Sequence, residues 1–178
     1  GSDASGSFKL YHAANGGMQL AKDRPVARAD TSLPLEVYNG GMAVTVLQRF
    51  KFIDAGVRLR LRDADLPRLG DLLKGQLVLV QEDAQGRVQN ATTAQLPGVL
   101  DDLYAAAEGV DDFGATLRGG GTQFKLWAPT AQQVSVLVFD DAEGPATRTQ
   151  DLRFDPRTGA WSATLPGSLA GRYYQYAV

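Results

Sequence analysis

Short apolar runs separated by glycine and proline constrain the fold of this chain more than any other feature of its sequence. The 178 residues include 20 glycines and 8 prolines, and these residues fall between the apolar runs. Runs of roughly four to eight apolar residues bounded by such residues are typical of β-strands, whereas helices need roughly ten or more. The pattern therefore predicts a mainly β protein.

The first part of the chain is predicted to combine strands with one or two short helices. Residues 57–62 alternate valine or leucine with arginine, which places three arginines on one face of a half-buried strand. That face either meets solvent or contacts an anion, a sugar hydroxyl or a partner domain. Helical spacing of leucines predicts a helix over 65–74 and a second one near 96–104. Strands are predicted over 8–11, 18–21, 33–38, 42–52, 76–82 and 87–93, with a hairpin turn at 83–86.

A domain boundary is predicted near residue 112, where a small, acidic stretch gives way to new strands. These cover 115–118, 123–127, 134–139, 151–154, 161–165 and 173–178, at a spacing that is typical of a β-sandwich. We therefore expect two β-sandwich, immunoglobulin-like domains, residues 8–112 and 113–178, with one or two short helices in the first. Residues 1–7 are polar and are expected to be a tag or linker.

Composition excludes several classes of partner and of chemistry. The net charge of −2 gives no basic surplus for nucleic acid, and no apolar run approaches the roughly 18 residues of a membrane span. The chain has no cysteine and one histidine, His12, and it lacks the G-x-S-x-G sequence of a nucleophile elbow. We expect no nucleic-acid or membrane partner, no metal site and no cofactor.

Catalytic carboxylates are not expected either. Acidic pairs occur at 101–102, 111–112 and 140–141, but the two members of each pair are adjacent in sequence. Adjacent side chains on a strand or helix diverge, whereas a glycosidase holds its two carboxylates roughly 5–10 Å apart across the sugar. The glycines at 119–121 lack the context of a phosphate-binding loop and predict a hairpin turn.

Aromatic residues in the second part are the candidate ligand contacts. Aromatic faces suit both a core and the apolar face of a glucose ring. Trp161 alternates with polar neighbours, which favours a core position, while Trp127 lies opposite the apolar positions of its own strand and is expected to be partly exposed. The candidates for carbohydrate binding are Trp127, Trp161 and Tyr174.

Three strings of the second part resemble one known β-sandwich. The sequence FKLWAPTA followed by VSVLVF, then GAWSATLPG, then GRYYQYAV, is similar to the carbohydrate-binding module of family 48, the isoamylase N-terminal domain that precedes the barrel of starch and glycogen debranching enzymes. The stretch from LVLVQEDAQG to QLPGVLDDLY resembles the N2 domain that precedes this module in type I pullulanases. The resemblance covers nearly the whole chain from Phe8 onward.

The resemblance implies a parent protein that hydrolyses α-1,6 links of pullulan and starch dextrins with a glycoside hydrolase family 13 barrel. Such a barrel needs about 250 residues, so this chain is expected to be a non-catalytic N-terminal fragment. Its implied partners are a downstream catalytic barrel in the same polypeptide and branched α-glucan. Family habit also implies a secreted, extracellular or periplasmic parent.

One departure from the family pattern limits the expected sugar affinity. Family members that hold glycogen carry a tryptophan just after the strand that corresponds to 134–139, whereas residues 140–145 hold no aromatic side chain. The family also adds a strand after YYQYAV, so the module is expected to be truncated at its last strand. Two alternatives stay open: a stand-alone starch- or glycogen-binding module, and an immunoglobulin-like structural or adhesion module unrelated to glucans.

Overall fold

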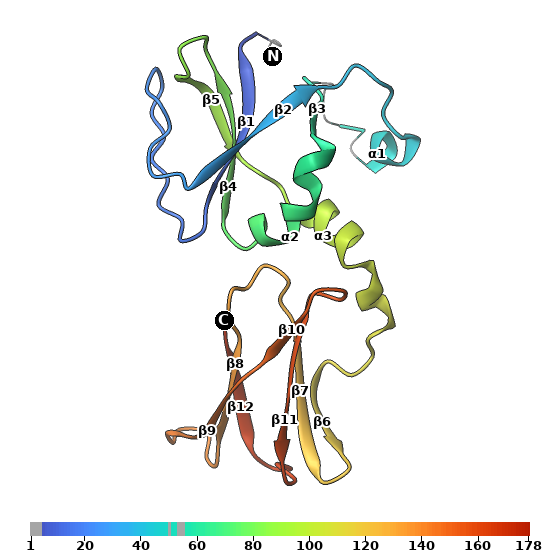
Figure 1. Ribbon diagram of the computed structural model, residues 1–178. Coiled ribbons are helices and arrows are strands. Elements are labelled where there is room, and N and C mark those ends of the chain that lie inside the picture. The colour runs from blue at the N-terminus through green and yellow to red at the C-terminus, as the bar shows by residue number, and fades with distance from the viewer. Residues whose placement is uncertain (1–4, 50, 53–55) are drawn as a thin grey trace. The chain divides into compact units, whose positions relative to one another are not determined.

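The chain folds as two compact units. The computed structural model describes residues 5–49, 51–52 and 56–178. Unit 1 extends to Ala94 and unit 2 begins at Gln95. Figure 1 shows that each unit is built mainly from antiparallel strands, which confirms the mainly β fold class.

Unit 1 contains one five-stranded antiparallel sheet in the order β3-β2-β1-β4-β5. Loop residues Met18, Val26 and Ala29 pack on one face of this sheet, against a cluster that includes Val78 and Val80. The loop therefore covers a face that a second sheet covers in a sandwich. The strands are β1 (Ser7–Ala13), β2 (Thr31–Val37), β3 (Leu59–Leu61), β4 (Gln76–Glu82) and β5 (Val88–Thr93).

Two strands predicted in the first domain are absent from the described residues of its sheet. Residues 18–21 contribute only an isolated bridge between Gln19 and Ala27. Residues 42–52 were predicted as a strand, but their described part contains the helix α1 (Val44–Arg49); residues 50 and 53–55 lie outside the described residues. Periodicity alone does not distinguish a short apolar strand from a short helix.

The predicted helix over 65–74 is confirmed in two parts. A 3-10 helix, η1 (Asp63–Arg68), leads into α2 (Leu69–Leu72), and Leu72 and Leu73 are buried. Of residues 1–7, expected to be a tag or linker, the described residues Ser5 and Ser7 contact unit 1. Ser7 pairs with Glu82 as the first residue of β1, and the Ser5 carbonyl accepts a hydrogen bond from Gln81.

Unit 2 is a sandwich of two antiparallel sheets, in the orders β10-β11-β7-β6 and β12-β8-β9. Phe124, Trp161 and Leu165 of the first sheet share a core with Val136 and Val138 of the second. Two short helices, α3 (Pro97–Leu103) and η2 (Ala105–Gly109), precede the strands. The strands are β6 (Gly114–Arg118), β7 (Gly121–Trp127), β8 (Ser135–Phe139), β9 (Ala146–Asp151), β10 (Arg153–Asp155), β11 (Ala160–Pro166) and β12 (Tyr173–Ala177).

Sequence patterning missed one strand of the sandwich. Every residue of β9 is exposed, so the strand carries no apolar alternation to reveal it. The predicted strand over 151–154 spans the corner at which β9 ends and β10 begins in the other sheet. Leu152, at that corner, is buried in the core.

Tyr104 ties the segment that contains α3 and η2 to the sandwich. The tyrosine is 5% exposed and its ring lies over Gly159, where a Cβ atom would come within 2.9 Å of the ring and 2.8 Å of Pro129. Gly159 also has a φ of 69°, a conformation that favours glycine. The contacts between residues therefore divide the chain into its two units after Ala94. The sequence predicts this boundary later, near residue 112.

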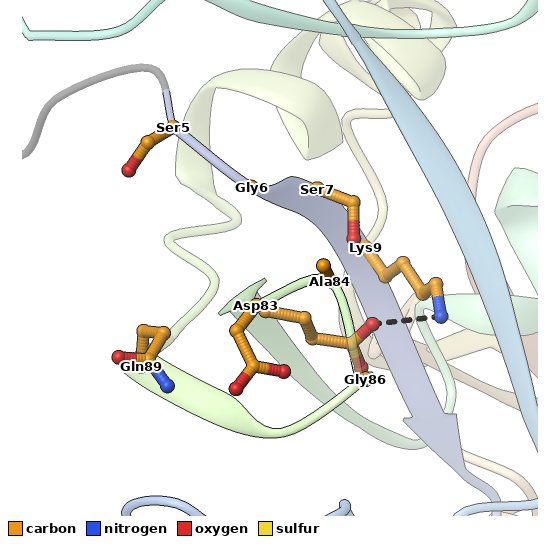
Figure 2. A pocket seen from close by; sticks show the side chains of 9 residues that line it. Ser5, Gly6, Ser7, Lys9, Asp83, Ala84, Gly86 and Gln89 are labelled. Carbon is orange, nitrogen blue, oxygen red and sulfur yellow. Dashed lines mark ion pairs between the residues drawn. The ribbon is translucent and has the colours of Figure 1, made fainter.

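An ion pair between a half-buried lysine and a buried glutamate joins two central strands of unit 1. Glu82 of β4 is 1% exposed, and its Oε2 lies 2.7 Å from the Lys9 ammonium of β1. The Tyr11 hydroxyl donates a hydrogen bond to Oε1. The hydrogen bond to Glu82 raises the pKa of Lys9, and burial together with the same carboxylate raises the pKa of Tyr11. Figure 2 shows the pair beside the β4–β5 turn.

Replacing the buried carboxylate tests this pair. Glu82→Ala is expected to lower the free energy of unfolding of unit 1 by about 2 kcal/mol, because hydrogen bonds to a charged group are lost. Urea unfolding followed by far-UV circular dichroism measures the change. Both tryptophans lie in unit 2, so their fluorescence transition should stay in place. Glu36→Ala, which removes an exposed pair with Arg60, is the control and should have little effect. Equal midpoints for Glu82→Ala and wild type would contradict the assignment.

A second ion cluster holds the start of the sandwich. Asp112 accepts a hydrogen bond from Lys125 of β7 and lies 2.9 Å from Arg118 of β6. The hydrogen bond from Lys125, with the charges of both cations, lowers the pKa of Asp112 from 3.8. The ionised carboxylate therefore stabilises the folded state above pH 3.8, and this stabilisation is lost as the pH falls through the lowered pKa.

The lowered pKa of Asp112 predicts how the stability of Asp112→Asn depends on pH. The melting temperature of unit 2, measured by tryptophan fluorescence, should be lower than that of wild type at pH 6, and the difference should shrink as the pH is lowered toward 2. Asp111→Asn, at an exposed neighbouring position, is the matched control and should follow wild type. A difference that is constant with pH would show that the charge of Asp112 is not responsible.

Candidate functional site

Trp161 belongs to the core of the sandwich. It is 7% exposed, packs beside Phe154 with ring centroids 5.1 Å apart, and donates its indole N–H to the Ala128 carbonyl at 2.9 Å. Neither ring face is free for a sugar. The structure thus places this candidate where the alternation on β11 predicted a core residue.

Trp127 lies on the outer face of the neighbouring strand. It pairs with Ala160, while Leu126 pairs with Trp161 on the inner face. Its side chain is 40% exposed, and its indole N–H donates to the Thr158 carbonyl at 2.9 Å. The ring is therefore fixed at one edge and partly open to solvent.

Tyr174 lies at the margin of the core. Its ring contacts Phe124 edge-on, with centroids 5.2 Å apart, yet the side chain is 40% exposed. It also lines a surface hollow on the β12-β8-β9 sheet, which contains neither tryptophan. The three predicted residues are therefore not assembled into one site.

The hollow that Tyr174 lines is the aromatic site of unit 2. Tyr173 of β12 pairs directly with Phe139 of β8, so the two rings share the outer face of the sheet. Tyr173 is 55% exposed. The turn between β8 and β9 forms the opposite wall. The lining residues are Phe139, Ala142, Glu143, Gly144, Tyr173, Tyr174 and Gln175.

An ion pair stands beside the hollow. Arg172, just before β12, lies 2.7 Å from Asp140, just after β8. The Thr147 hydroxyl of β9 lies 3.4 Å from the same carboxylate. These contacts fix the ends of the strands that carry Phe139 and Tyr173.

The composition of the hollow suits a neutral, polyhydroxylated ligand. An exposed tyrosine ring can lie against the apolar face of a pyranose, while the Gln175 amide and the Glu143 carboxylate can exchange hydrogen bonds with hydroxyls. The carboxylate of Asp140, beside the hollow, is paired with Arg172. The arrangement can bind a sugar but does not supply the facing acid and base of a glycosidase.

Neither Tyr173 nor Phe139 is among the three residues predicted from the sequence to bind carbohydrate. The signal was nevertheless present in the sequence YYQY. Alternation along that strand places Tyr173 and Gln175 on the face opposite to Tyr174 and Tyr176. What the sequence alone did not supply was the register that sets Tyr173 beside Phe139.

Unit 1 has a hollow of a different kind, between the start of β1 and the β4–β5 turn (Figure 2). Its charged groups already have partners: Lys9 is paired with Glu82, and Asp83 with Arg87. Backbone and side-chain hydrogen bonds from Arg87 lower the pKa of Asp83, as does the Gln85 amide. The lining includes no aromatic ring, so this hollow offers no stacking surface for a sugar.

Metal and histidine chemistry find no support among the described residues. No group of three or more histidine, cysteine or carboxylate side chains there is arranged to hold a metal ion. His12 lies within β1, paired with Thr31 and Leu77, and its ring lies where a Cβ on Gly75 would be, 2.4 Å from Nε2. None of the described helices is both long enough and apolar enough to cross a membrane.

Two family models match consecutive parts of the chain. Residues 1–102 match the pullulanase N2 domain, and residues 112–178 match carbohydrate-binding module 48, the isoamylase N-terminal domain. The second match contains Trp127, Trp161 and the whole Tyr173 hollow.

Similar proteins include pullulanases from a bacterium and a plant. The chain is 36% identical over 133 residues to a pullulanase of Klebsiella pneumoniae and 32% identical over 176 residues to pullulanase 1, chloroplastic, of Arabidopsis thaliana. The matches cover 75% and 97% of this chain. A 1,4-alpha-glucan branching enzyme of Rhodospirillum rubrum is 43% identical over 56 residues, or 32% of this chain and 7% of the relative.

Solved structures agree with these relatives. The maltotriose complex of PulA from Klebsiella pneumoniae superposes with a TM-score of 0.83 at 30% identity over 99% of this chain. That match covers 18% of the PulA chain, and the two pullulanase sequences are covered to 12% and 17%. The chain therefore spans less than a fifth of the relatives that it matches.

The contrasting positions of the two tryptophans give a stability prediction. Trp161→Ala should lower the free energy of unfolding of unit 2 by about 3–5 kcal/mol, because it removes a large buried ring. Trp127→Ala should cost clearly less, since its ring is partly solvated. Urea unfolding followed by far-UV circular dichroism compares the two variants. Similar losses would show that Trp127 is as much a core residue as Trp161.

Proposed function

Because the chain belongs to the pullulanase N2 domain family through residues 1–102 and matches carbohydrate-binding module 48 over 112–178, we propose that it forms the non-catalytic N-terminal part of a debranching enzyme. The parent would hydrolyse α-1,6 links of pullulan and starch dextrins. In this role the two units brace the catalytic barrel and guide branched α-glucan toward it.

The observation that carries the proposal is the extent of the structural match. Nearly all of this chain, 99%, superposes on one part of a PulA chain with a TM-score of 0.83. The 178 residues are occupied by two β-rich units, and a (β/α)₈ barrel needs about 250 residues of its own. The barrel is therefore assigned to another part of the parent polypeptide. An extracellular or periplasmic address for that parent stays a prediction.

Glucan contact is assigned to the Tyr173 hollow. Its support is the exposed Tyr173 ring beside Phe139, the adjacent Gln175 amide, and strand ends fixed by the Arg172–Asp140 pair. The site is shallow and lacks a tryptophan, so weak binding is expected. A second candidate, a stand-alone starch-binding module, is favoured by one observation, the partly exposed Trp127 ring on the other sheet. The pullulanases and the branching enzyme described above do not favour the adhesion-module alternative.

Affinity electrophoresis in gels that contain amylopectin tests these roles. Wild type should be modestly retarded, and Tyr173→Ala should weaken the retardation by up to about tenfold, the range expected for one aromatic contact. Tyr38→Ala is the matched control, because Tyr38 is a 41% exposed tyrosine of unit 1 and should leave retardation unchanged.

The other outcomes discriminate between the hypotheses. Retardation that is abolished by Trp127→Ala but not by Tyr173→Ala would favour the stand-alone module. Absence of retardation for wild type would remove the glucan-guiding role. Hydrolysis of pullulan by the 178-residue chain itself would contradict the non-catalytic assignment.

A further inference from the structure

Helix α1 of unit 1 separates its polar and apolar side chains. Around the helix, Val44, Val46 and Leu47 occupy one half, and the other half holds Thr45, Gln48 and Arg49. Such segregation is the pattern of a helix that lies on an apolar surface. The sequence of α1 is thus suited to burial of one half.

No residue of α1 is buried. The exposed fractions are 67% for Val44, 39% for Val46 and 51% for Leu47. A helix of six residues is also far shorter than the roughly 12 residues at which isolated helices become even marginally stable in water. Both the exposed apolar half and the short length indicate that α1 needs a cover that the described residues do not supply.

The small size of this apolar half indicates what kind of cover it has. Even with the neighbouring Phe52 ring, which is 90% exposed, the exposed area of these three aliphatic side chains falls below the roughly 800 Å² that each partner buries in a stable protein–protein interface. A separate protein or a second copy would not be held by so small a contact. A surface in the same polypeptide would be held by a contact of this size, because tethering raises the effective concentration of that surface to the millimolar range.

We propose that the apolar half of α1 docks on a part of the parent polypeptide that lies outside residues 1–178. This inference rests on the proposed function only in that it requires the longer parent, of which the matched relatives have more than four fifths beyond the shared region. The docking surface is apolar, to match the three exposed aliphatic side chains of α1. Unit 1 thereby attaches to the body of the enzyme through a helix rather than through its sheet.

Limited proteolysis of the parent protein with trypsin tests the docking. Trypsin cleaves after Arg49 and Lys51, and mass spectrometry maps the rate at each position. Cleavage there should be slow in the wild-type parent and at least tenfold faster in Leu47→Asp, which places a charge on the apolar half. Thr45→Asp, on the polar half of the same helix, is the matched control and should behave as wild type.

A further cleavage position shows whether unit 1 stays folded. Arg87 lies in the β4–β5 turn, where it is bonded to Asp83. Slow cleavage after Arg87 in Leu47→Asp means that α1 has detached from its cover without unfolding of the unit, as the proposal requires. If cleavage after Arg87 also becomes fast, unit 1 has unfolded in this variant, and hydrogen exchange of the wild-type parent is measured instead. Slow exchange of the α1 amides is then required by the docking, and fast exchange contradicts it.

The remaining outcomes overturn the proposal. Rapid cleavage after Arg49 and Lys51 in the wild-type parent would show that α1 is uncovered. Equal protection in the 178-residue chain alone would place the cover within residues 1–178. Protection that rises with protein concentration would identify a second copy as the cover. Pullulan hydrolysis by the parent is assayed on the same sample, so that a failure of the proposed function is seen separately from a failure of the docking.

Discussion

The register between β12 and β8 is the constraint on which both the sandwich core and the aromatic site depend. It sets Tyr176 opposite Val136 on the inner face and Tyr173 opposite Phe139 on the outer face. A slip of one residue would exchange the two faces. The Tyr176 hydroxyl, within hydrogen-bond distance of the Lys125 carbonyl on the other sheet, ties this register to the sandwich. Burial raises the pKa of Tyr176 to about 12, so the phenol stays neutral at physiological pH.

Most of the fold could be predicted because its strands carry an apolar pattern or a turn signal. The β4–β5 hairpin and the strands that contain Trp127 and Trp161 lie close to where the sequence places them. The failures have physical causes. The strand β9 is exposed along its whole length and so has no apolar alternation. The helix α1 has only six residues, too few for periodicity to distinguish a helix from a strand. In unit 1 a loop that contains Met18 and Val26 packs on one face of the sheet, and a loop has no periodicity that would predict this packing.

The candidate site was only partly predictable. Alternation along single strands separated Trp161, in the core, from Trp127, on the surface, because that distinction needs only one strand. The hollow needs two strands and a turn: Tyr173 and Phe139 are far apart in the sequence and become neighbours only through pairing. The sequence predicts Tyr174 of β12 as a contact, whereas the more exposed ring on that strand is its neighbour Tyr173.

The contact of Tyr104 with Gly159 has a consequence for anyone who divides this chain into modules. The match to the second module begins at residue 112, yet Tyr104 packs on a surface of the sandwich beside Pro129. A module excised at residue 112 would lose that ring and present bare glycine and proline to water. The excision that preserves the native surface is the one made after Ala94, where the contacts themselves divide.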